Sequence, residues 1–367
     1  MDYLKKLQYH YKPKKGWIND PNGLVFFDGY YHMFYQHLPH YEKPGNEAMH
    51  WGHARTKDFI NWEEFPVALY PDKSYDCDGC YSGTAIVKDD ILYLFYASIK
   101  IPEGETSLTQ TVSVAYSKDG IHFEKYEKNP IIDCYPEDGG PDFRDPAVIC
   151  IDGKYYCVMA TGNPETQKGR LLIYDSDNLF DWKYKGIMSE WDNCEFTECP
   201  SFVKAGEKYL LTTSVCPLNE KRYFSIMYGN FKDGVFKAEL IDEIDKGPDQ
   251  YAGQVFLDDK GRNILIAWVP GWSYVGFAEK DIGCMSVPRQ LFVKDGQIYG
   301  YPVEEVRHLL KDNDPAVKIT EDGFIIERTG RESVVYHGEI AELKIIRDEY
   351  LVEVFVNGGR EIYTAVL

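Results

Sequence analysis

The segment Asp28-Gly29-Tyr30-Tyr31-His32-Met33-Phe34-Tyr35 is a turn followed by a strand rich in aromatic residues, and the chain repeats this pattern. Four further copies, each a short turn leading into an apolar strand, lie at 89–96, 152–159, 205–211 and 260–268. The copies start 53 to 63 residues apart, and a period of this size is typical of propellers or repeat arrays. Each unit has room for about four short strands. The repeat therefore predicts an all-β fold, a five-bladed β-propeller.

A second element keeps the same period. The segments 54–62, 115–123 and 174–182 each follow their own aromatic strand and end in Trp62, Phe123 or Trp182. Rings at the same place in successive units are suited to packing between blades. Three unrelated surface turns are the alternative, but two elements in step favour a true repeat.

Three of the five copies carry an acidic residue at about the same distance before the turn. Seven or eight residues before the five copies stand Asp20, Ser82, Asp145, Glu198 and Gly253, the last with Gln254 beside it. In a propeller the first strand of each blade lines the central channel, so residues at its start converge on one rim. We therefore expect three carboxylates to meet in one pocket.

Converging carboxylates suit the cleavage of a glycosidic bond, in which one acid protonates the leaving oxygen and another attacks. A lone Asp-Pro is more often a turn cap, but three acids in register favour a site because their repulsion has to be offset. Metal binding is the competing interpretation. The set offers no His and, as a sulfur ligand, only Cys199, and three spread carboxylates are few for a hard cation. We expect neither a metal nor another cofactor.

Three blocks resemble the signatures of glycoside hydrolase family 32, the invertase and fructan hydrolase family: Trp17-Ile18-Asn19-Asp20-Pro21-Asn22-Gly23, Arg144-Asp145-Pro146 and Glu198-Cys199-Pro200. Shorter blocks at 34–36, 51–53, 81–83, 251–256 and 286–291 agree in order, so the resemblance extends over about residues 9 to 310. A chance match over that length is implausible. The family is a five-bladed propeller that retains anomeric configuration.

The resemblance implies roles for the acids. Asp20 would be the nucleophile that forms a fructosyl-enzyme, Glu198 the general acid and then base, and Asp145 a stabiliser that holds fructose hydroxyls. Asn19, Asn22 and Arg144 are expected to keep Asp20 and Asp145 ionised through hydrogen bonds and charge. The matching positions expected to bind substrate are Trp17, Asn19, Gln36, Trp51, Tyr81, Ser82, Arg144, Asp249, Tyr251 and Trp272. For each aromatic residue of this set, core packing is an equally good interpretation.

Two residues beside the acid depart from the family pattern. Thr197 stands where relatives usually have Trp, and Ser201 where they usually have Asp. Small hydroxyl residues at these places predict an open leaving-group side and a loose requirement for the sugar joined to fructose.

The C-terminal part also departs. About 65 residues follow Tyr301-Pro302, fewer than the β-sandwich of relatives. Strands are still predicted at 323–328, 343–347 and 351–356, the last turning at Asn357-Gly358 into 361–366. We expect a catalytic propeller at 1–302 and a shortened β-sandwich-like domain at 303–367. An exposed edge strand of that sandwich is a surface that a homodimer would cover.

Composition narrows the partners. A formal net charge of −19 argues against nucleic acid or an anionic membrane and leaves a small carbohydrate as the expected partner. The first eight residues lack the apolar stretch of a secretory signal, so the expected location is the cytoplasm. The nine cysteines are expected to be reduced thiols there, and the Cys77-Asp78-Gly79-Cys80 pair lacks the second pair of a zinc site.

The function favoured by these patterns is hydrolysis of the terminal fructosyl bond of sucrose or short fructooligosaccharides. Sucrose 6-phosphate hydrolysis and fructosyl transfer are alternatives on the same scaffold, and an inactive sugar-binding propeller is the non-enzyme alternative. The lack of an obvious Lys/Arg cluster in sequence beside the site weighs against the 6-phosphate. The three intact acids weigh against a pure binding module, since fold alone does not decide function.

Overall fold

The computed structural model describes residues 7–41, 47–269 and 283–367. In these ranges the regular elements are strands, except for one 3-10 helix, η1 (Glu304–Leu309). The fold is all-β, as predicted. Five antiparallel sheets follow one another in chain order, and in each of them four strands pair in sequence order, while the fifth sheet has one further strand beside this path. They are β1 (Trp17–Phe27), β2 (Tyr30–Leu38), β3 (His50–Thr56) and β4 (Glu63–Leu69); β5 (Gly79–Lys88), β6 (Ile91–Lys100), β7 (Thr109–Ser117) and β8 (Glu124–Lys125); β9 (Asp142–Ile151), β10 (Lys154–Asn163), β11 (Lys168–Ser176) and β12 (Lys183–Asp192); β13 (Cys194–Ala205), β14 (Lys208–Pro217), β15 (Tyr223–Lys232) and β16 (Val235–Asp242); and β17 (Tyr251–Leu257), β18 (Asn263–Val269), β20 (Arg289–Lys294) and β21 (Gln297–Pro302), with β19 (Cys284–Met285) beside β18.

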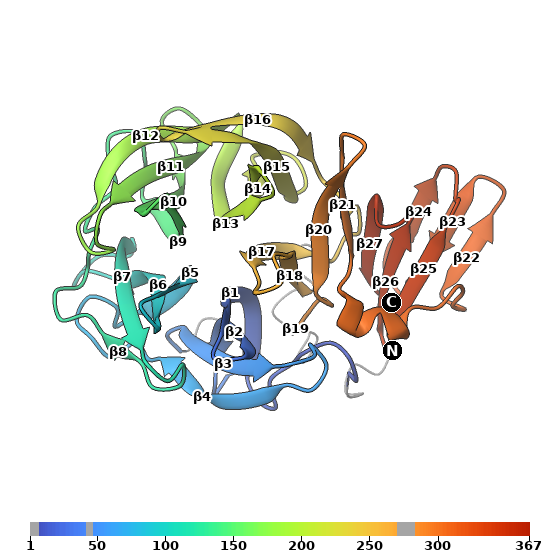
Figure 1. Cartoon of the computed structure of the whole chain (residues 1–367), viewed down its shortest axis with the longest axis horizontal. Coiled ribbons are helices and arrows are strands. Elements are labelled where there is room, and N and C mark those ends of the chain that lie inside the picture. Colours follow the sequence, from blue (N-terminus) through green and yellow to red (C-terminus); the bar gives the residue numbers. More distant parts are fainter. Residues whose placement is uncertain (1–6, 42–46, 270–282) are drawn as a thin grey trace.

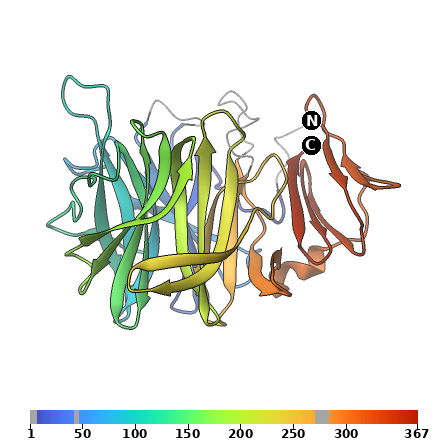
Figure 2. The same ribbon diagram turned by 90° about the horizontal axis from the view of Figure 1, so that it is seen from above.

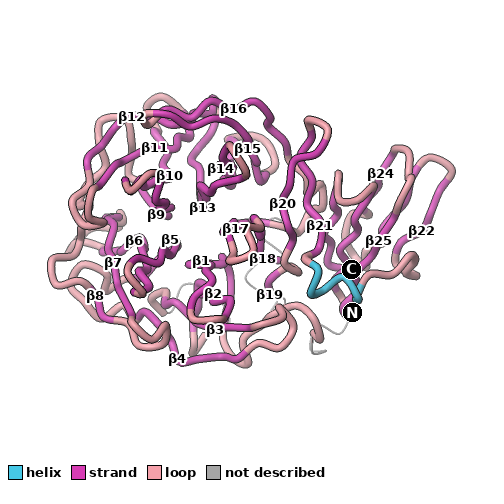
Figure 3. Tube along the Cα trace, viewed as in Figure 1, coloured by secondary structure: helices cyan, strands magenta, loops and turns pink. Residues whose placement is uncertain are grey.

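The five sheets stand around a common centre (Figure 1). The first strand of each sheet lies innermost (Figure 1), and in the turned view many strands stand upright while outer strands cross them (Figure 2). The innermost strands contact one another in sequence, and β17 contacts β1, so the ring is closed. The Cα trace shows the same alternation of long strands and short connections around the ring (Figure 3).

Each innermost strand contains a β-bulge at the same place. Two residues of the first strand face one residue of the second at 19–20, 81–82, 145–146, 199–200 and 252–253. Three of the bulges include a residue with left-handed backbone, namely Asp145, Cys199 and Ala252, with φ of 58°, 48° and 51°. A bulge redirects the side chains beside it, so all five strands change direction at one level of the channel.

The innermost strands of the five sheets do not pair with one another through backbone hydrogen bonds. Polar side chains connect them instead. The hydroxyl of Thr84 donates to the carbonyl of Pro146 (2.9 Å) and accepts from the amide of Val148 (3.0 Å). Ser201 Oγ accepts from the amide of Val255 (2.9 Å). Gln254 accepts from the Leu24 amide and donates to the Gly83 carbonyl, both at 3.0 Å. These bonds satisfy backbone groups that would otherwise be orphaned inside the channel.

The second repeated element is one hydrogen-bonded turn used three times. The hydroxyls of Thr56, Ser117 and Ser176 each accept the amide of the residue three positions on, at 2.9 to 3.1 Å. The rings that end these segments pack across sheets, since Phe123 meets Phe34 at 5.4 Å and Trp182 meets Phe95 at 6.1 Å between ring centres. The prediction of aromatic packing between neighbouring units is confirmed.

Two three-stranded sheets complete the chain: β22 (Val317–Thr320), β23 (Gly323–Ile326) and β24 (Val334–His337), then β25 (Leu343–Asp348), β26 (Leu351–Val356) and β27 (Glu361–Val366). They lie together at one side of the ring (Figure 1). The predicted hairpin is present, because β26 pairs with β27 and Asn357 has a φ of 51°. Ile346, Phe355 and Ile362 of this region pack into one apolar cluster with Ile244 and Leu291.

No helix in the described ranges is long and apolar enough to cross a membrane.

Candidate active site

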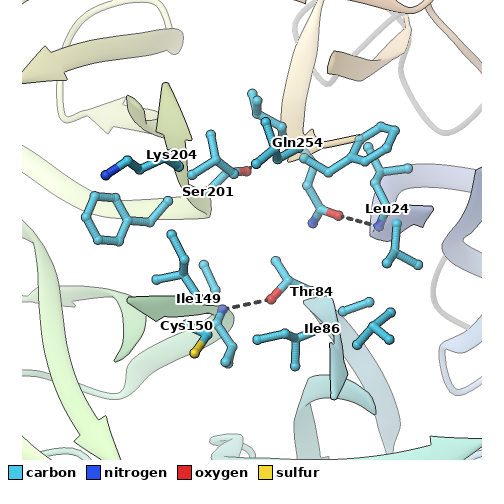
Figure 4. Close-up of a pocket in the computed structure, with 18 of the residues that line it drawn as sticks. Leu24, Thr84, Ile86, Ile149, Cys150, Ser201, Lys204 and Gln254 are labelled. Carbon is cyan, nitrogen blue, oxygen red and sulfur yellow. Dashed lines mark hydrogen bonds between the residues drawn. The ribbon is translucent and has the colours of Figure 1, made fainter. Parts of the chain in front are cut away.

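The three acids lie at the same end of the innermost strands, at or beside the bulges. Asp20 and Asp145 belong to the bulges of β1 and β9, and Glu198 immediately precedes that of β13. The next residues of each strand line an axial cavity of about 340 Å³. Its wall includes Leu24, Thr84, Ile86, Ile149, Cys150, Ser201, Lys204 and Gln254 (Figure 4). The acids therefore stand at one rim of the channel, as the repeat register predicts.

Asp20 receives hydrogen bonds from two other sheets. Ser82 Oγ of β5 donates to Oδ2 at 2.9 Å, and the thiol of Cys199 on β13 approaches the same oxygen at 3.5 Å. Oδ1 is buried and has no hydrogen-bond partner among the described residues. Oδ2 of Asp20 is thus fixed by these contacts.

Asp145 is buried and is tied to the same cysteine. The amide of Cys199 donates to Oδ2 at 2.7 Å, and the left-handed backbone of Cys199 belongs to the bulge. Cys199 follows Glu198 directly, so one dipeptide of β13 reaches both other acids. The three carboxylates form a connected cluster.

Glu198 is held at both oxygens. Arg144 Nη1 donates to Oε1 at 3.1 Å, the Tyr251 hydroxyl donates to Oε2, and the thiol of Cys216 lies 3.5 Å from Oε2. Arg144 also donates to Asp142. Charged donors of this kind orient a carboxylate strongly, so the Glu198 side chain has a defined direction.

Burial governs the protonation of the two aspartates. Burial raises the pKa of Asp20, and the charge of Glu198 adds to this, although Ser82 and Cys199 act in the opposite sense. Burial likewise raises the pKa of Asp145 to about 7, against the charge of Arg144. The hydrogen bond of Asn19 to Asp20 and the charge of Arg144 beside Asp145 lower the two pKa values, as expected, but desolvation of the buried carboxylates outweighs them.

Several residues predicted to bind substrate form hydrogen bonds within the protein near the acids. Trp17 Nε1 donates to Asn19 Oδ1 at 2.7 Å, and Gln36, opposite the Asp20 bulge, donates to the Cys80 carbonyl at 3.0 Å. Trp51 is fully buried and donates to the Tyr81 carbonyl at 2.9 Å. For Trp51 the packing interpretation is therefore the better one.

Asp249 is bound to the C-terminal part of the chain. Its Oδ2 accepts from Arg328 Nη2 at 2.5 Å and from the Val366 amide at 2.7 Å, so it joins the fifth sheet to the C-terminal strands. No described contact links it to Asp20, Asp145 or Glu198. Trp272 falls outside the described residues.

Thr197 and Ser201, the two departures beside the acid, are both buried and hydrogen-bonded to other strands. Thr197 is fully buried and donates to the Arg170 carbonyl at 2.7 Å. Ser201 is buried and accepts from the Val255 amide in the channel wall. Both side chains bond to the backbone of other strands, and the open leaving-group side stays a prediction.

Three further residues join the site from positions that the sequence analysis did not single out. Asp142 binds Arg144, Cys216 lies 3.1 Å from the Tyr251 hydroxyl, and Arg222 Nη1 stands 4.0 Å from Glu198 Oε2. Asp142 sits two residues from Arg144 and could have been found as a local charge pair. Cys216 lies on β14, and Arg222 lies in the connection between β14 and β15. No sequence pattern relates these two positions to the acids.

Comparisons with known proteins agree with this geometry. A family model described as "Glycosyl hydrolases family 32 N-terminal domain" matches residues 10–302. A raffinose invertase of Escherichia coli is 36% identical over 323 residues, covering 84% of this chain and 66% of the relative. A sucrose-6-phosphate hydrolase of Bacillus subtilis is 30% identical over 428 residues, covering 97% and 88%.

Among solved structures, a GH32 beta-fructofuranosidase of Bombyx mori superposes with a TM-score of 0.85 at 26% identity, covering 99% of this chain and 89% of that one. The chain spans just under two thirds of the length of the first curated relatives it matches. The match of the family model over most of the chain, together with these relatives, shows that the chain belongs to glycosyl hydrolase family 32.

Proposed function

We propose that this protein is a retaining β-fructofuranosidase, which hydrolyses the terminal fructosyl bond of sucrose or of short fructooligosaccharides. The observation that carries the proposal is the cluster of Asp20, Asp145 and Glu198 at one rim, linked through Cys199. Relatives named as a raffinose invertase and as a beta-fructofuranosidase support the substrate class.

In the first step, Oδ1 of Asp20 attacks the anomeric carbon of the fructosyl unit. Glu198 gives its proton to the glycosidic oxygen as the bond to the leaving sugar breaks, and a covalent fructosyl-enzyme forms. The hydrogen bond from Ser82 holds the other oxygen of Asp20, so the attacking oxygen is presented in one direction.

In the second step, Glu198 takes a proton from water, which attacks the same carbon and frees Asp20. Configuration is retained because the carbon is displaced twice. Asp145 binds fructose hydroxyls in this scheme, and Trp17, Asn19, Gln36, Tyr81, Ser82 and Arg144 form the surroundings of the fructose end. Tyr251 acts by donating to Glu198.

The proposed architecture is a five-bladed β-propeller at 1–302 with a shortened β-sandwich-like domain at 303–367. The five closed sheets support the first assignment. The second is supported by the two three-stranded sheets after η1. The alignment with the Bacillus subtilis relative extends over 428 residues, although this chain has 367. The relative thus has segments without a counterpart here. A cytoplasmic location and assembly as a homodimer belong to the same proposal.

The test is a hydrolysis panel of sucrose, kestose, inulin and levan, with products separated by chromatography and Asp20→Ala as the matched inactive control. Release of free fructose by the wild type alone supports the assignment. If the wild type binds these sugars and releases no fructose, the inactive sugar-binding propeller is the correct function. Release of longer fructosides in place of fructose points to transfer.

Sucrose 6-phosphate is the second candidate substrate. The sequence shows no basic cluster beside the acids, but the fold brings Arg222 to within 4.0 Å of Glu198, where Arg144 already lies. A guanidinium at this place favours an anionic group on the leaving sugar. The Bacillus subtilis relative named for that substrate is consistent with it.

A further inference from the structure

Arg222 is a second guanidinium beside Glu198 and lies just before β15. Its Nη1 is 4.0 Å from Glu198 Oε2, which is longer than a hydrogen bond. The guanidinium carbon lies 5.7 Å from the ring centre of Phe196 and 5.8 Å from that of Tyr251. Ring faces at this distance attract a cation without occupying its N–H donors.

Arg144 provides the contrast on the other side of Glu198. Its side chain is 15% exposed and donates to both Asp142 and Glu198, whereas the Arg222 side chain is 35% exposed. A guanidinium carries five N–H donors in a fixed plane. Arg222 is therefore the more exposed of the two guanidinium groups beside Glu198.

The position of Arg222 relative to the acids decides which part of a substrate it meets. In the proposed function, on which this inference rests, Glu198 protonates the oxygen of the leaving sugar while Asp20 attacks from the fructose side. A cation at Oε2 therefore stands on the leaving-group side. The 4.0 Å between Arg222 Nη1 and Glu198 Oε2 is longer than a hydrogen bond, so this guanidinium is available to a second anion.

We infer that Arg222 is a specificity-determining residue for the leaving sugar and that it selects substrates with a phosphate on that sugar. The planar fork of Arg matches a phosphate in a bidentate manner. The neighbouring Lys221 does not share this role, because it is exposed and its Nζ donates to the Gly247 carbonyl at 3.2 Å.

The test compares kcat/KM for sucrose and sucrose 6-phosphate in the wild type, Arg222→Gln, Arg222→Lys and the charge-matched control Lys221→Gln. A charge-assisted hydrogen bond contributes about 1.5 to 3 kcal/mol. The wild-type preference for the phosphorylated substrate should therefore fall about 10- to 100-fold in Arg222→Gln and less in Arg222→Lys. Lys221→Gln should keep the wild-type preference. Titration of glucose 6-phosphate and glucose into the same variants gives a readout that needs no turnover.

Equal losses on both substrates in Arg222→Gln would overturn the inference and indicate that Arg222 acts through Glu198. A wild type that cleaves both substrates without preference would overturn it as well, while leaving the proposed function intact. A folded wild type that cleaves neither substrate would refute the proposed function itself. Melting temperatures of the variants separate a specific loss from unfolding.

Discussion

His10 lies in a buried ionic cluster between the ring of sheets and the C-terminal strands. Its ring Nδ1 is 3.0 Å from Asp348 Oδ2 and its Nε2 is 2.9 Å from Glu353 Oε1, and the His10 and Glu353 side chains are 0% exposed. Two ring nitrogens can both donate only when the imidazole is protonated. Arg289 continues the cluster by binding Glu353 at 2.7 Å and Asp245 at 2.6 Å.

The protonated ring stabilises the fold by an amount that depends on pH. Burial by itself lowers the pKa of His10, but the hydrogen bonds and charges of Asp348 and Glu353 raise it from 6.5 to about 9. A difference of about 2.5 units corresponds to about 3.4 kcal/mol. Because the pKa is higher in the folded state, this stabilisation is fully present below pH 6.5 and is lost as the pH rises through about 9.

We therefore expect His10→Gln to be less stable than the wild type by about 3 kcal/mol at pH 6, by about half of that near pH 8, and by little above pH 9. Urea unfolding followed by tryptophan fluorescence at these three pH values measures the difference. His308→Gln is the matched control, because His308 is exposed on η1, and it should change the free energy of unfolding by less than about 0.5 kcal/mol. A difference for His10→Gln that is constant between pH 6 and 9.5, or that grows, would refute the reasoning.

Three further predictions concern the acids. Asp20→Ala should lose nearly all turnover on every substrate, whereas Glu198→Ala should retain relatively more on an activated aryl fructoside whose leaving group needs no proton; equal losses on both substrate types would contradict the role of Glu198. Burial raises the pKa of Asp20 above 3.8, so kcat/KM should fall as the pH decreases through an apparent pKa above about 4. This apparent pKa belongs to the coupled acids together. A pH–rate profile that stays flat down to pH 3.5 would be inconsistent with this prediction. Burial raises the pKa of Asp145 from 3.8 to about 7, so the folded protein loses stability as the pH rises through this range. Asp145→Asn should therefore be inactive, yet its free energy of unfolding should exceed that of the wild type by up to about 4 kcal/mol at pH 8 and equal it near pH 3.5. A urea midpoint below that of the wild type at pH 8 would count against this prediction.

The all-β fold and the gathering of the acids could be predicted from the sequence, because a repeat imposes the same geometry on each copy. Asp20, Asp145 and Glu198 each stand seven or eight residues before the turn of their copy, which places them at the same end of the innermost strands. Relative to the bulges they occupy three successive positions, which the repeat does not reveal. The hydrogen-bonded turns after 56, 117 and 176 are local for the same reason, since each hydroxyl reaches an amide three residues away.

The environment of the acids was decided only by the tertiary structure. The bulges at five equivalent places, the contacts of Cys216 and Arg222 with Glu198, and the use of Asp249 and Thr197 between strands all depend on residues distant in sequence. The pKa values of Asp20 and Asp145 depend on how completely water is excluded, a property of the packed assembly that the flanking residues do not reveal. The sequence by itself thus determined which groups are present at the rim and in what order, while their charge, their partners and the identity of the nearby cations followed from how the five sheets close around them.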